Sequence, residues 1–336
     1  MLHYNCIMDS MITNTLAEAR IKTDSHNPVV GVGIRPSGEI HLGNIVTMAT
    51  AAILARELHG SLDLVICDLD LPSYTEGKIV QPFKYQEDIN GCHENVSEHY
   101  STFINSFSKE LARILDLGLN IRYLSDIQAQ QGFRETLKTV LDQKEEFRKI
   151  IGRTNDRDYK VPVRPVCQEC GFISKKLPVY NINTGYIKTK CKNDDCITHE
   201  IKVDVLDTDQ VLTVHHIVDP IKDVSTDPKV DIHIFGGDYH IPSNGNKRSK
   251  LWQIEDLFKL TGQSVPVLFS TLTVYGNNGK RMSKSNRNGL SFSTLQQLYE
   301  GNLALKVMEF TDGLLSKEYH HAPFPICKDF FEHNID

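Results

Sequence analysis

The alternation of strand-like and helix-like segments is the feature that most constrains the fold of this 336-residue chain. Residues 28–34 are a short apolar run that ends in a turn, and residues 62–67 repeat this strand pattern with β-branched side chains. Between them, residues 44–58 carry apolar side chains at helical spacing, and Gly60 follows as a helix stop. Two strands separated by a helix predict a parallel α/β sheet.

The α/β pattern is interrupted once and then returns. Further helices are expected at residues 101–115, 133–151 and 250–260, and further strands at residues 230–235 and 265–275. Residues 152–205 break the pattern because they are rich in proline, lysine, asparagine and cysteine. We therefore expect the first half of a Rossmann-like catalytic domain at residues 1–151, a small insertion at 152–205, the second half of the domain at 206–290 and a short, mainly helical segment at 291–336.

The composition is that of an ordinary globular protein, with no apolar stretch long enough for a membrane span. Residues 1–20 lack the basic start and apolar middle of a signal peptide, which favours a cytoplasmic location. The net charge is −6, from 37 basic and 43 acidic residues, whereas proteins that hold large nucleic acids usually carry excess positive charge. Any contact with a nucleic acid is therefore expected to involve a small basic region of the surface. The sequence does not indicate an oligomeric state.

Two close cysteine pairs lie inside the insertion. Cys167 and Cys170 are separated by two residues, and Cys191 and Cys196 by four. Two such thiolate pairs, about 20 residues apart, are typical of a structural zinc site, and a small insertion with little apolar content needs such a link. Disulfides are the alternative, which a cytoplasmic location disfavours. His199 is either a substitute ligand or an ordinary surface residue.

Lysines decorate the same insertion, namely Lys175, Lys176, Lys188, Lys190 and Lys192. Such a set is either a solvated arm or a contact for an anionic acceptor, such as the 3′ end of a tRNA. The sequence leaves both interpretations open.

The turn between the first strand and the first helix reads Pro-Ser-Gly-Glu-Ile-His-Leu-Gly-Asn at residues 36–44. A helix N-terminus offers unpaired backbone N–H groups and the positive end of the helix dipole, so it binds phosphate well. Gly43 lets a ligand approach the backbone, and His41 can donate a hydrogen bond to a phosphate oxygen. The alternative is a simple turn with a polar helix cap.

A second motif, Gly-Lys-Arg-Met-Ser-Lys-Ser, follows at residues 279–285. Small residues around a lysine suit a loop that closes on a triphosphate and neutralises the departing pyrophosphate. The alternative is a solvated basic loop.

Taken together, the two motifs resemble the HIGH and KMSKS signatures of class I aminoacyl-tRNA synthetases. The proline-serine-glycine lead-in, with Asn44 in place of the second histidine, is most similar to class I lysyl-tRNA synthetases, the archaeal type. The resemblance runs from about residue 27 to residue 291. It implies a class I synthetase α/β fold: a Rossmann-like parallel sheet, a small zinc-ribbon insertion and a short helical C-terminal segment, in a shortened form without the anticodon-binding domain.

The resemblance also implies roles for individual residues. The catalytic residues would be His41, Asn44, Arg281 and Lys284. The ATP-binding residues would be Pro36, Ser37, Gly38, His41, Gly43, Asn44, Gly236, Gly237, Asp238, Met282, Ser283, Lys284 and Ser285. Candidates for the amino-acid pocket are Asp68, Asp70, Glu76, Asp219 and His240.

The chain departs from the family pattern at two positions that bear on the site. Arg281 replaces the first lysine of the second signature and keeps its charge with a different donor geometry. The segment at residues 214–219 lacks the tryptophans that the family has before its Gly-x-Asp motif, and Trp252 is the only tryptophan in the chain. That segment shapes the amino-acid pocket in the family.

The expected reaction is the attack of an amino-acid carboxylate, most simply that of lysine, on the α-phosphate of Mg-ATP, followed by transfer to tRNA. ATP, Mg²⁺ and a structural Zn²⁺ are the expected cofactors. One alternative is a ligase that passes the activated amino acid to a small molecule, a carrier or a peptide. A nucleotidyltransferase is a further alternative, but such enzymes usually keep the second histidine of the first motif, which is Asn44 here. A non-catalytic binding module is disfavoured because it would not need the loop at residues 279–285.

Overall fold

The computed structural model of the chain describes residues 26–35, 40–68, 77–80, 85–87, 93–94, 96–150, 163–169, 172–173, 178–191, 196, 200–210, 212–214, 218–237, 239, 249–271, 273–274, 294–296, 302–316 and 321–322. Within these residues, no helix is both long enough and apolar enough to cross a membrane.

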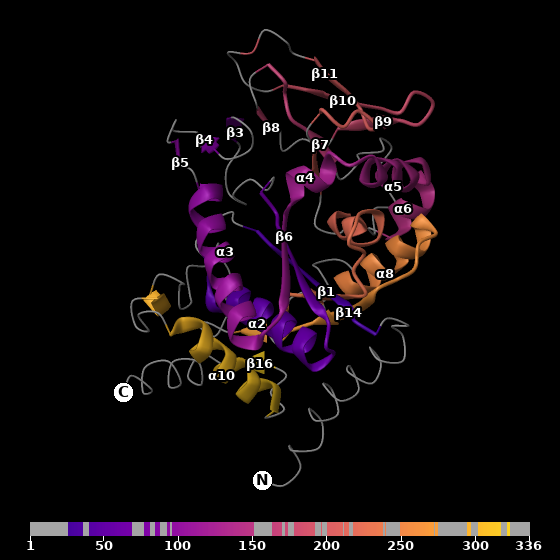
Figure 1. Cartoon of the computed structure of the whole chain (residues 1–336). Coiled ribbons are helices and arrows are strands. Elements are labelled where there is room, and N and C mark those ends of the chain that lie inside the picture. Colours follow the sequence, from indigo (N-terminus) through magenta and orange to yellow (C-terminus); the bar gives the residue numbers. More distant parts are fainter. Residues whose placement is uncertain are drawn as a thin grey trace.

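A five-stranded sheet forms the centre of the molecule, and all its neighbouring strands are parallel. Its strands, in spatial order, are β14 (Val267–Ser270), β13 (Ile232–Phe235), β1 (Val29–Ile34), β2 (Ser61–Ile66) and β6 (Gly118–Tyr123). β1 is central, and β13 pairs with it although the insertion separates the two strands in sequence (Figure 1). The predicted parallel α/β sheet is therefore confirmed.

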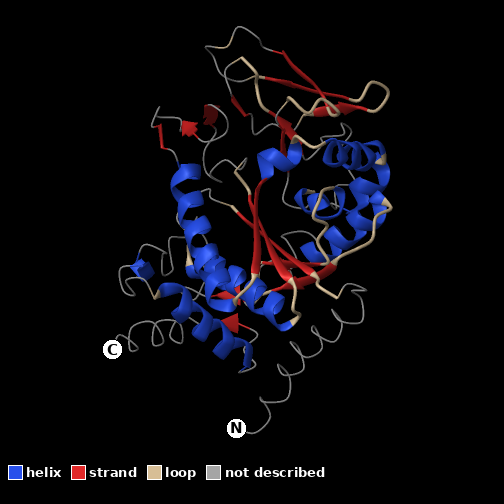
Figure 2. Cartoon of the chain, viewed as in Figure 1, coloured by secondary structure: helices blue, strands red, loops and turns tan. Residues whose placement is uncertain are grey.

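Helices cover both faces of this sheet (Figure 2). One layer consists of α2 (Leu42–Glu57), α3 (Val96–Leu115) and α10 (Leu303–Ser316). The other consists of α4 (Leu124–Gln128), α5 (Gln131–Asp142), α6 (Lys144–Ile150) and α8 (Lys250–Thr261). The first layer contributes apolar side chains to one hydrophobic core, and the second layer contributes to a core and a smaller cluster on the opposite face of the sheet.

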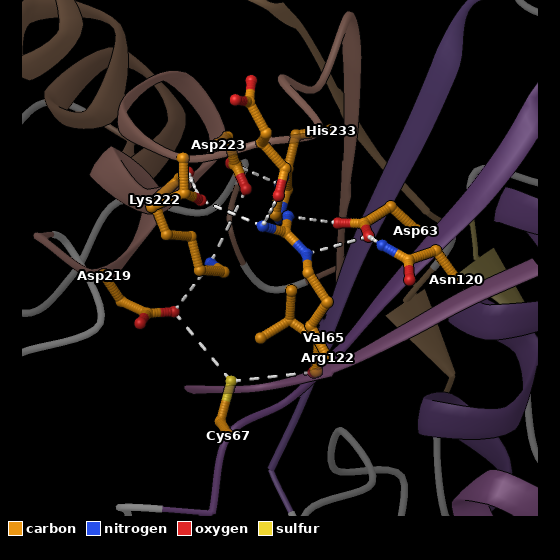
Figure 3. Close-up of polar contacts among 11 residues, drawn as sticks. Asp63, Val65, Cys67, Asn120, Arg122, Asp219, Lys222, Asp223 and His233 are labelled. Atoms are coloured by element: carbon orange, nitrogen blue, oxygen red, sulfur yellow. Dashed lines mark hydrogen bonds and ion pairs between the residues drawn. The ribbon is translucent and has the colours of Figure 1, made fainter. Parts of the chain in front are cut away.

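The two faces of the sheet differ in polarity. Side chains alternate along a strand, so every second residue points to the same face. Val30, Val32 and Ile34 of β1 pack into the core beneath α2, together with the leucines of β2. The opposite face carries glycines in β1 and charged or polar side chains in the neighbouring strands, including Asp63 and His233, which are 0% and 3% exposed. A short segment, η1 (Asp219–Ile221) followed by α7 (Lys222–Ser225), lies beside this polar face (Figure 3).

The insertion forms small antiparallel sheets at one end of the molecule (Figure 1). β7 (Val163–Pro165) pairs with β12 (Leu212–Val214), which brings the two ends of the insertion together. A three-stranded sheet contains β9 (Val179–Asn181), β10 (Tyr186–Lys190) and β11 (Glu200–Asp204). A four-stranded sheet joins β8 (Phe172–Ile173) to β3 (Gly77–Val80), β4 (Tyr85–Glu87) and β5 (His93–Glu94). Near the other end, β15 (Thr273–Val274) pairs with β16 (His321–Ala322).

The structure differs from the predicted elements in two stretches of the chain. The single helix predicted at residues 133–151 is divided into α5 and α6 by Gln143, whose backbone leaves the helical region at φ −86° and ψ 49°. β6 and α4 fall in a stretch where no element was predicted, because β6 carries Asn120 and Arg122 where an apolar strand pattern would be expected.

Candidate active site

The N-terminus of α2 lies where β1 ends, at the carboxyl edge of the parallel strands. His41 is the N-cap residue, and its carbonyl oxygen accepts hydrogen bonds from the backbone N–H groups of Asn44 at 2.9 Å and Ile45 at 3.3 Å. In return, the side-chain Oδ1 of Asn44 accepts a hydrogen bond from the backbone N–H of His41 at 3.4 Å. Asn44 therefore secures the helix start, which is a local reason for an amide at this position.

Gly43 leaves room for the imidazole of His41. A Cβ atom added at Gly43 would lie 3.0 Å from Cε1 and 3.1 Å from Nδ1 of His41, closer than ordinary carbon contacts. The glycine therefore sets the position of the imidazole ring as well as the access to the helix N-terminus.

The end of β13 supplies a second part of this edge. Gly236 and Gly237 follow the strand, and the ring of Phe235 stacks on that of Tyr239 with centroids 4.7 Å apart. The backbone N–H of Tyr239 donates to the carbonyl of Gly236 at 3.0 Å, which closes a tight turn. β1 and β13 are neighbours, so the two glycine-containing turns lie at the same edge, where open α/β sheets bind ligands.

Asp68, predicted as an amino-acid ligand, caps a helix in the structure. Its Oδ1 accepts from the backbone N–H of Ser125 at 3.0 Å, and its Oδ2 accepts from the Ser125 hydroxyl at 2.6 Å, at the start of α4. Burial raises the pKa of the Asp68 carboxyl, although the hydrogen bonds from Ser125 act in the opposite direction. Both oxygens are thus engaged within the protein.

A buried cluster of charged side chains lies on the polar face of the sheet (Figure 3); we call it the ion cluster. Its members are Asp63, Arg122, Asp219, Lys222, Asp223 and His233. Asp63 of β2 forms an ion pair with Arg122 of β6. Nη2 of Arg122 lies 2.5 Å from Oδ2 of Asp63, and Nε of Arg122 donates to Oδ1 of Asp63 at 3.0 Å. Asn120 donates to the same Oδ1 at 2.8 Å, so this carboxylate is fully engaged.

Lys222 forms the other half of the ion cluster. Its side chain is 1% exposed, and Nζ donates to Oδ2 of Asp219 at 3.0 Å and lies 3.8 Å from Oδ1 of Asp223. Oδ2 of Asp223 lies 2.6 Å from Nδ1 of His233 on β13. The cluster therefore ties the segment containing η1 and α7 to the central sheet.

Within the ion cluster, opposite charges stabilise each other's ionised forms. Burial alone would lower the pKa of the Lys222 ammonium, but Asp219 and Asp223 beside it raise it above its ordinary value. Burial would raise the pKa of Asp223, but His233 and Lys222 hold it below its ordinary value. At neutral pH the lysine and the aspartate are therefore both charged.

Sequence reasoning missed most of this cluster, since only Asp219 had been predicted as a site residue. The available signal was the alternation of polar residues within strands, at Asp63 in β2 and at Asn120 and Arg122 in β6. Such residues normally indicate a solvated face, and only the pairing of β2 with β6 makes these three partners.

Three of the four predicted zinc ligands come together. The Sγ atoms of Cys167, Cys191 and Cys196 lie within 4.8 Å of one another, and all three residues are buried. The Sγ atoms of Cys167 and Cys196 are 3.7 Å apart, too far for a disulfide. Two sulfurs that share a tetrahedral zinc at the usual bond length lie about 3.8 Å apart, so this donor set fits zinc. Cys170 lies outside the described residues.

Three lysines share the outward face of the neighbouring three-stranded sheet with two acidic residues. Lys188 on β10 lies directly opposite Lys202 on β11, a like-charged pair that disfavours strand pairing. Lys202 Nζ also lies 3.9 Å from the centroid of the Tyr186 ring, and Lys188 lies 3.5 Å from a carboxylate oxygen of Glu200. Lys190 is exposed on the same strand.

A surface hollow of about 640 Å³ lies elsewhere, between α3 and the edge strand β6. Lys109 and Arg113 line it from the helix, and Leu119, Ile121 and Tyr123 line it from the strand. It contains none of the sequence-predicted site residues.

The remaining predicted site residues lie outside the described residues. They are Pro36, Ser37, Gly38, Asp70, Glu76, Asp238, His240, Arg281, Met282, Ser283, Lys284 and Ser285.

Comparisons with known proteins agree on one family. The family model described as "tRNA synthetases class I (K)" matches residues 9–308. A lysine–tRNA ligase of Archaeoglobus fulgidus is 27% identical over 51% of this chain and 37% of its own length. Lysine–tRNA ligase 1 of Methanosarcina acetivorans is 32% identical over 44% of this chain and 30% of its own length. The aligned part thus spans about a third of these curated relatives.

Among solved structures, a glutamate–tRNA synthetase of Elizabethkingia anophelis matches 90% of this chain and 70% of its own, with 14% identity and a TM-score of 0.44. The family match over residues 9–308, together with the parallel sheet, shows that this chain belongs to the class I tRNA synthetase family of the lysine type.

Proposed function

We propose that the protein activates lysine with ATP to form lysyl-adenylate and transfers the lysyl group to tRNA. The observation that carries this proposal is the arrangement of His41, Gly43 and Asn44 at the N-terminus of α2, where β1 ends. A helix N-terminus at the carboxyl edge of a parallel sheet is suited to bind the phosphates of a nucleotide. Membership of the lysine-type family and the names of the relatives support lysine as the amino acid.

The reaction requires positioning and charge stabilisation and no covalent nucleophile. An oxygen of the amino-acid carboxylate attacks the α-phosphorus of ATP, the bond to the bridging oxygen breaks, and pyrophosphate leaves with the electron pair. His41 would donate a hydrogen bond to the phosphates, and Arg281 and Lys284 would neutralise the charge of the leaving pyrophosphate. Bound Mg²⁺ would supply further charge neutralisation at these phosphates.

We propose further that Cys167, Cys170, Cys191 and Cys196 hold a structural zinc ion. The separation of 3.7 Å between the sulfurs of Cys167 and Cys196 supports this assignment. The zinc would stabilise the insertion and thereby the sheet that presents Lys188 and Lys202. This lysine-bearing face is the proposed contact for the acceptor end of tRNA, since lysines beside an aromatic ring suit single-stranded nucleic acid.

The net charge of −6 supports a second class of acceptor for the activated lysine, other than tRNA. That charge weakens attraction to a whole tRNA and favours a ligase that passes lysine to a small molecule, a carrier or a peptide. A gel-shift assay with total tRNA over a salt series separates the two, since a tRNA ligase should bind at low salt.

The activation step is tested by amino-acid-dependent ATP–pyrophosphate exchange with each of the twenty amino acids, with and without tRNA. Exchange that depends on lysine is expected, and its absence for every amino acid under both conditions would refute activation. His41→Ala and Lys284→Ala should each reduce the exchange rate far more than they weaken lysine binding. His26→Ala, at an exposed histidine, is the matched control and should leave the rate unchanged.

A further inference from the structure

β6 lies at one edge of the central sheet. It pairs with β2 over its whole length, and within the described part of the chain no strand pairs with its other side. The outer N–H and C=O groups of such an edge can pair with another strand, so edge strands are usually short or carry proline or lysine. β6 contains neither residue, whereas the opposite edge strand, β14, is shorter and directly follows Pro266.

The hollow of about 640 Å³ runs between this edge and α3 (Figure 1). Leu119, Ile121 and Tyr123 line it from β6, and each of these side chains is half-buried against the core beneath α3. Asn120 and Arg122, the residues between them, point to the opposite face of the sheet. An apolar floor therefore lies directly beside a strand edge that can accept a further strand.

The helix side of the hollow carries more positive than negative charge. Lys109 and Arg113 line it along α3, and Asp116 lines it just after the helix. Arg113 also pairs with Glu110 at 2.7 Å, whereas Lys109 forms no ion pair within the described residues. Acidic side chains with aliphatic stems can contact the apolar floor and reach these two cations, so the hollow is complementary in charge to an acidic ligand.

We propose that β6 and α3 bind an extended acidic peptide segment of a partner protein, which adds a strand to the central sheet. Its main chain pairs with the outer edge of β6, and every second side chain enters the hollow. Glutamate at these positions pairs with Lys109 and Arg113. The inference goes beyond amino-acid activation, since the hollow contains none of the residues at the N-terminus of α2.

Two other occupants fit the hollow less well. A nucleic acid would place phosphates near the carboxylate of Asp116, and it has no peptide main chain to pair with the strand edge. A second copy of the chain would bring its own α3, with the same excess of positive charge, against Lys109 and Arg113. An acidic peptide has neither disadvantage.

The test uses the peptide acetyl-Thr-Glu-Thr-Leu-Thr-Glu-Thr-amide, whose residue order is the same in both directions. Calorimetry with the purified chain should give a Kd at or below about 1 mM, as is usual for a short unoptimised segment. The same peptide with lysine in place of glutamate should bind at least roughly 10-fold more weakly. Absence of binding by the glutamate peptide, or equal affinity for the two peptides, overturns the inference.

Two N-methylated forms of the glutamate peptide test the main-chain pairing. In an added strand, the amides of alternate residues point to β6 and the others point to solvent. One form is methylated on the threonine amides and the other on the glutamate and leucine amides. One of them should lose at least roughly 10-fold in affinity while the other keeps it, because only one set of amides donates to β6. Equal affinities of the two forms overturn the pairing.

Amide hydrogen exchange locates the bound peptide. Exchange in residues 118–123 should slow when the unmethylated peptide is added, because their outer N–H groups become paired. Unchanged exchange there overturns the inference. Slower exchange that follows protein concentration alone, or that an oligonucleotide produces and the peptide does not, assigns the edge to a second copy or to nucleic acid and also overturns it.

A charge reversal completes the test. Lys109→Glu, at an exposed position, should weaken binding of the glutamate peptide roughly 3- to 10-fold and strengthen binding of the lysine peptide. Lys259→Glu is the matched control, because Lys259 is exposed on α8 in the other helix layer, and it should leave both affinities unchanged. Equal effects of the two variants overturn the inference. Lysine-dependent pyrophosphate exchange should be the same in both variants as in the wild type, and its absence from all three refutes the proposed activation alone.

Discussion

Arg122 Nη2 lies 2.5 Å from Oδ2 of Asp63, across the neighbouring parallel strands β6 and β2. Their side chains are 10% and 1% exposed, so the carboxylate depends on the guanidinium for its charge balance. Arg122→Met leaves a buried charge unpaired and should lower the free energy of unfolding by about 3–5 kcal/mol. Urea denaturation at neutral pH measures the change. Asp63→Asn should cost less, because the Arg122 guanidinium keeps its hydrogen bonds to Thr226 Oγ1 and to the carbonyl of Asp227. An equal loss in both variants would contradict this account.

Gly43 should matter for catalysis and hardly at all for stability. In Gly43→Ala the new Cβ would lie 3.0 Å from Cε1 of His41 and displace the imidazole. A displacement of this kind should slow ATP–pyrophosphate exchange roughly 10- to 100-fold. The melting temperature should stay the same or rise, because alanine favours a helix more than glycine does. Gly118→Ala, whose Cβ would make an ordinary 3.5 Å contact with Ser61, is the control and should keep the exchange rate.

The cysteine cluster should hold one zinc ion per chain. Cys191→Ser removes a soft thiolate ligand, so elemental analysis after purification should show loss of zinc and a lower melting temperature. Cys67→Ser is the control, since Cys67 is buried beside Asp219, away from the cluster. Full zinc content in Cys191→Ser would contradict the proposed site.

Acid should weaken the ion cluster through Asp223. Burial raises the pKa of this carboxyl, but His233 and Lys222 outweigh it and hold the pKa below its ordinary value. A group with a lowered pKa in the folded state stabilises the fold above its unfolded pKa of about 3.9, and this stabilisation is lost as the pH falls below that value. The free energy of unfolding of Asp223→Asn should therefore fall less steeply than that of the wild type between about pH 5 and pH 2. Parallel slopes in urea titrations would contradict this role.

Much of the fold was predictable because its central strands and helices follow simple periodicities. β1, β2 and α2 lie within a residue or two of their predicted positions, since apolar side chains there face a single core. β6 was missed because Asn120 and Arg122 face a buried carboxylate on the neighbouring strand, which no local pattern reveals.

The local geometry around some of the predicted site residues could be anticipated from the sequence, whereas their roles stay predictions. The caps and glycines of residues 41–44 are such a case, and so is the close approach of Cys167, Cys191 and Cys196. Asp68 was a plausible ligand by charge, but its partner Ser125 is distant in sequence. The burial of Lys222 between Asp219 and Asp223 was not predictable, because lysine side chains usually face water.

The central claim is the formation of lysyl-adenylate, and a single-turnover measurement of pyrophosphate release tests it most directly. Purified chain is mixed with excess ATP, Mg²⁺ and lysine in the absence of tRNA. We predict a burst of pyrophosphate that approaches one equivalent per chain, together with lysyl-adenylate in the quenched mixture. ATP binding without lysine-dependent release of pyrophosphate, both in this mixture and after tRNA is added, would contradict the claim.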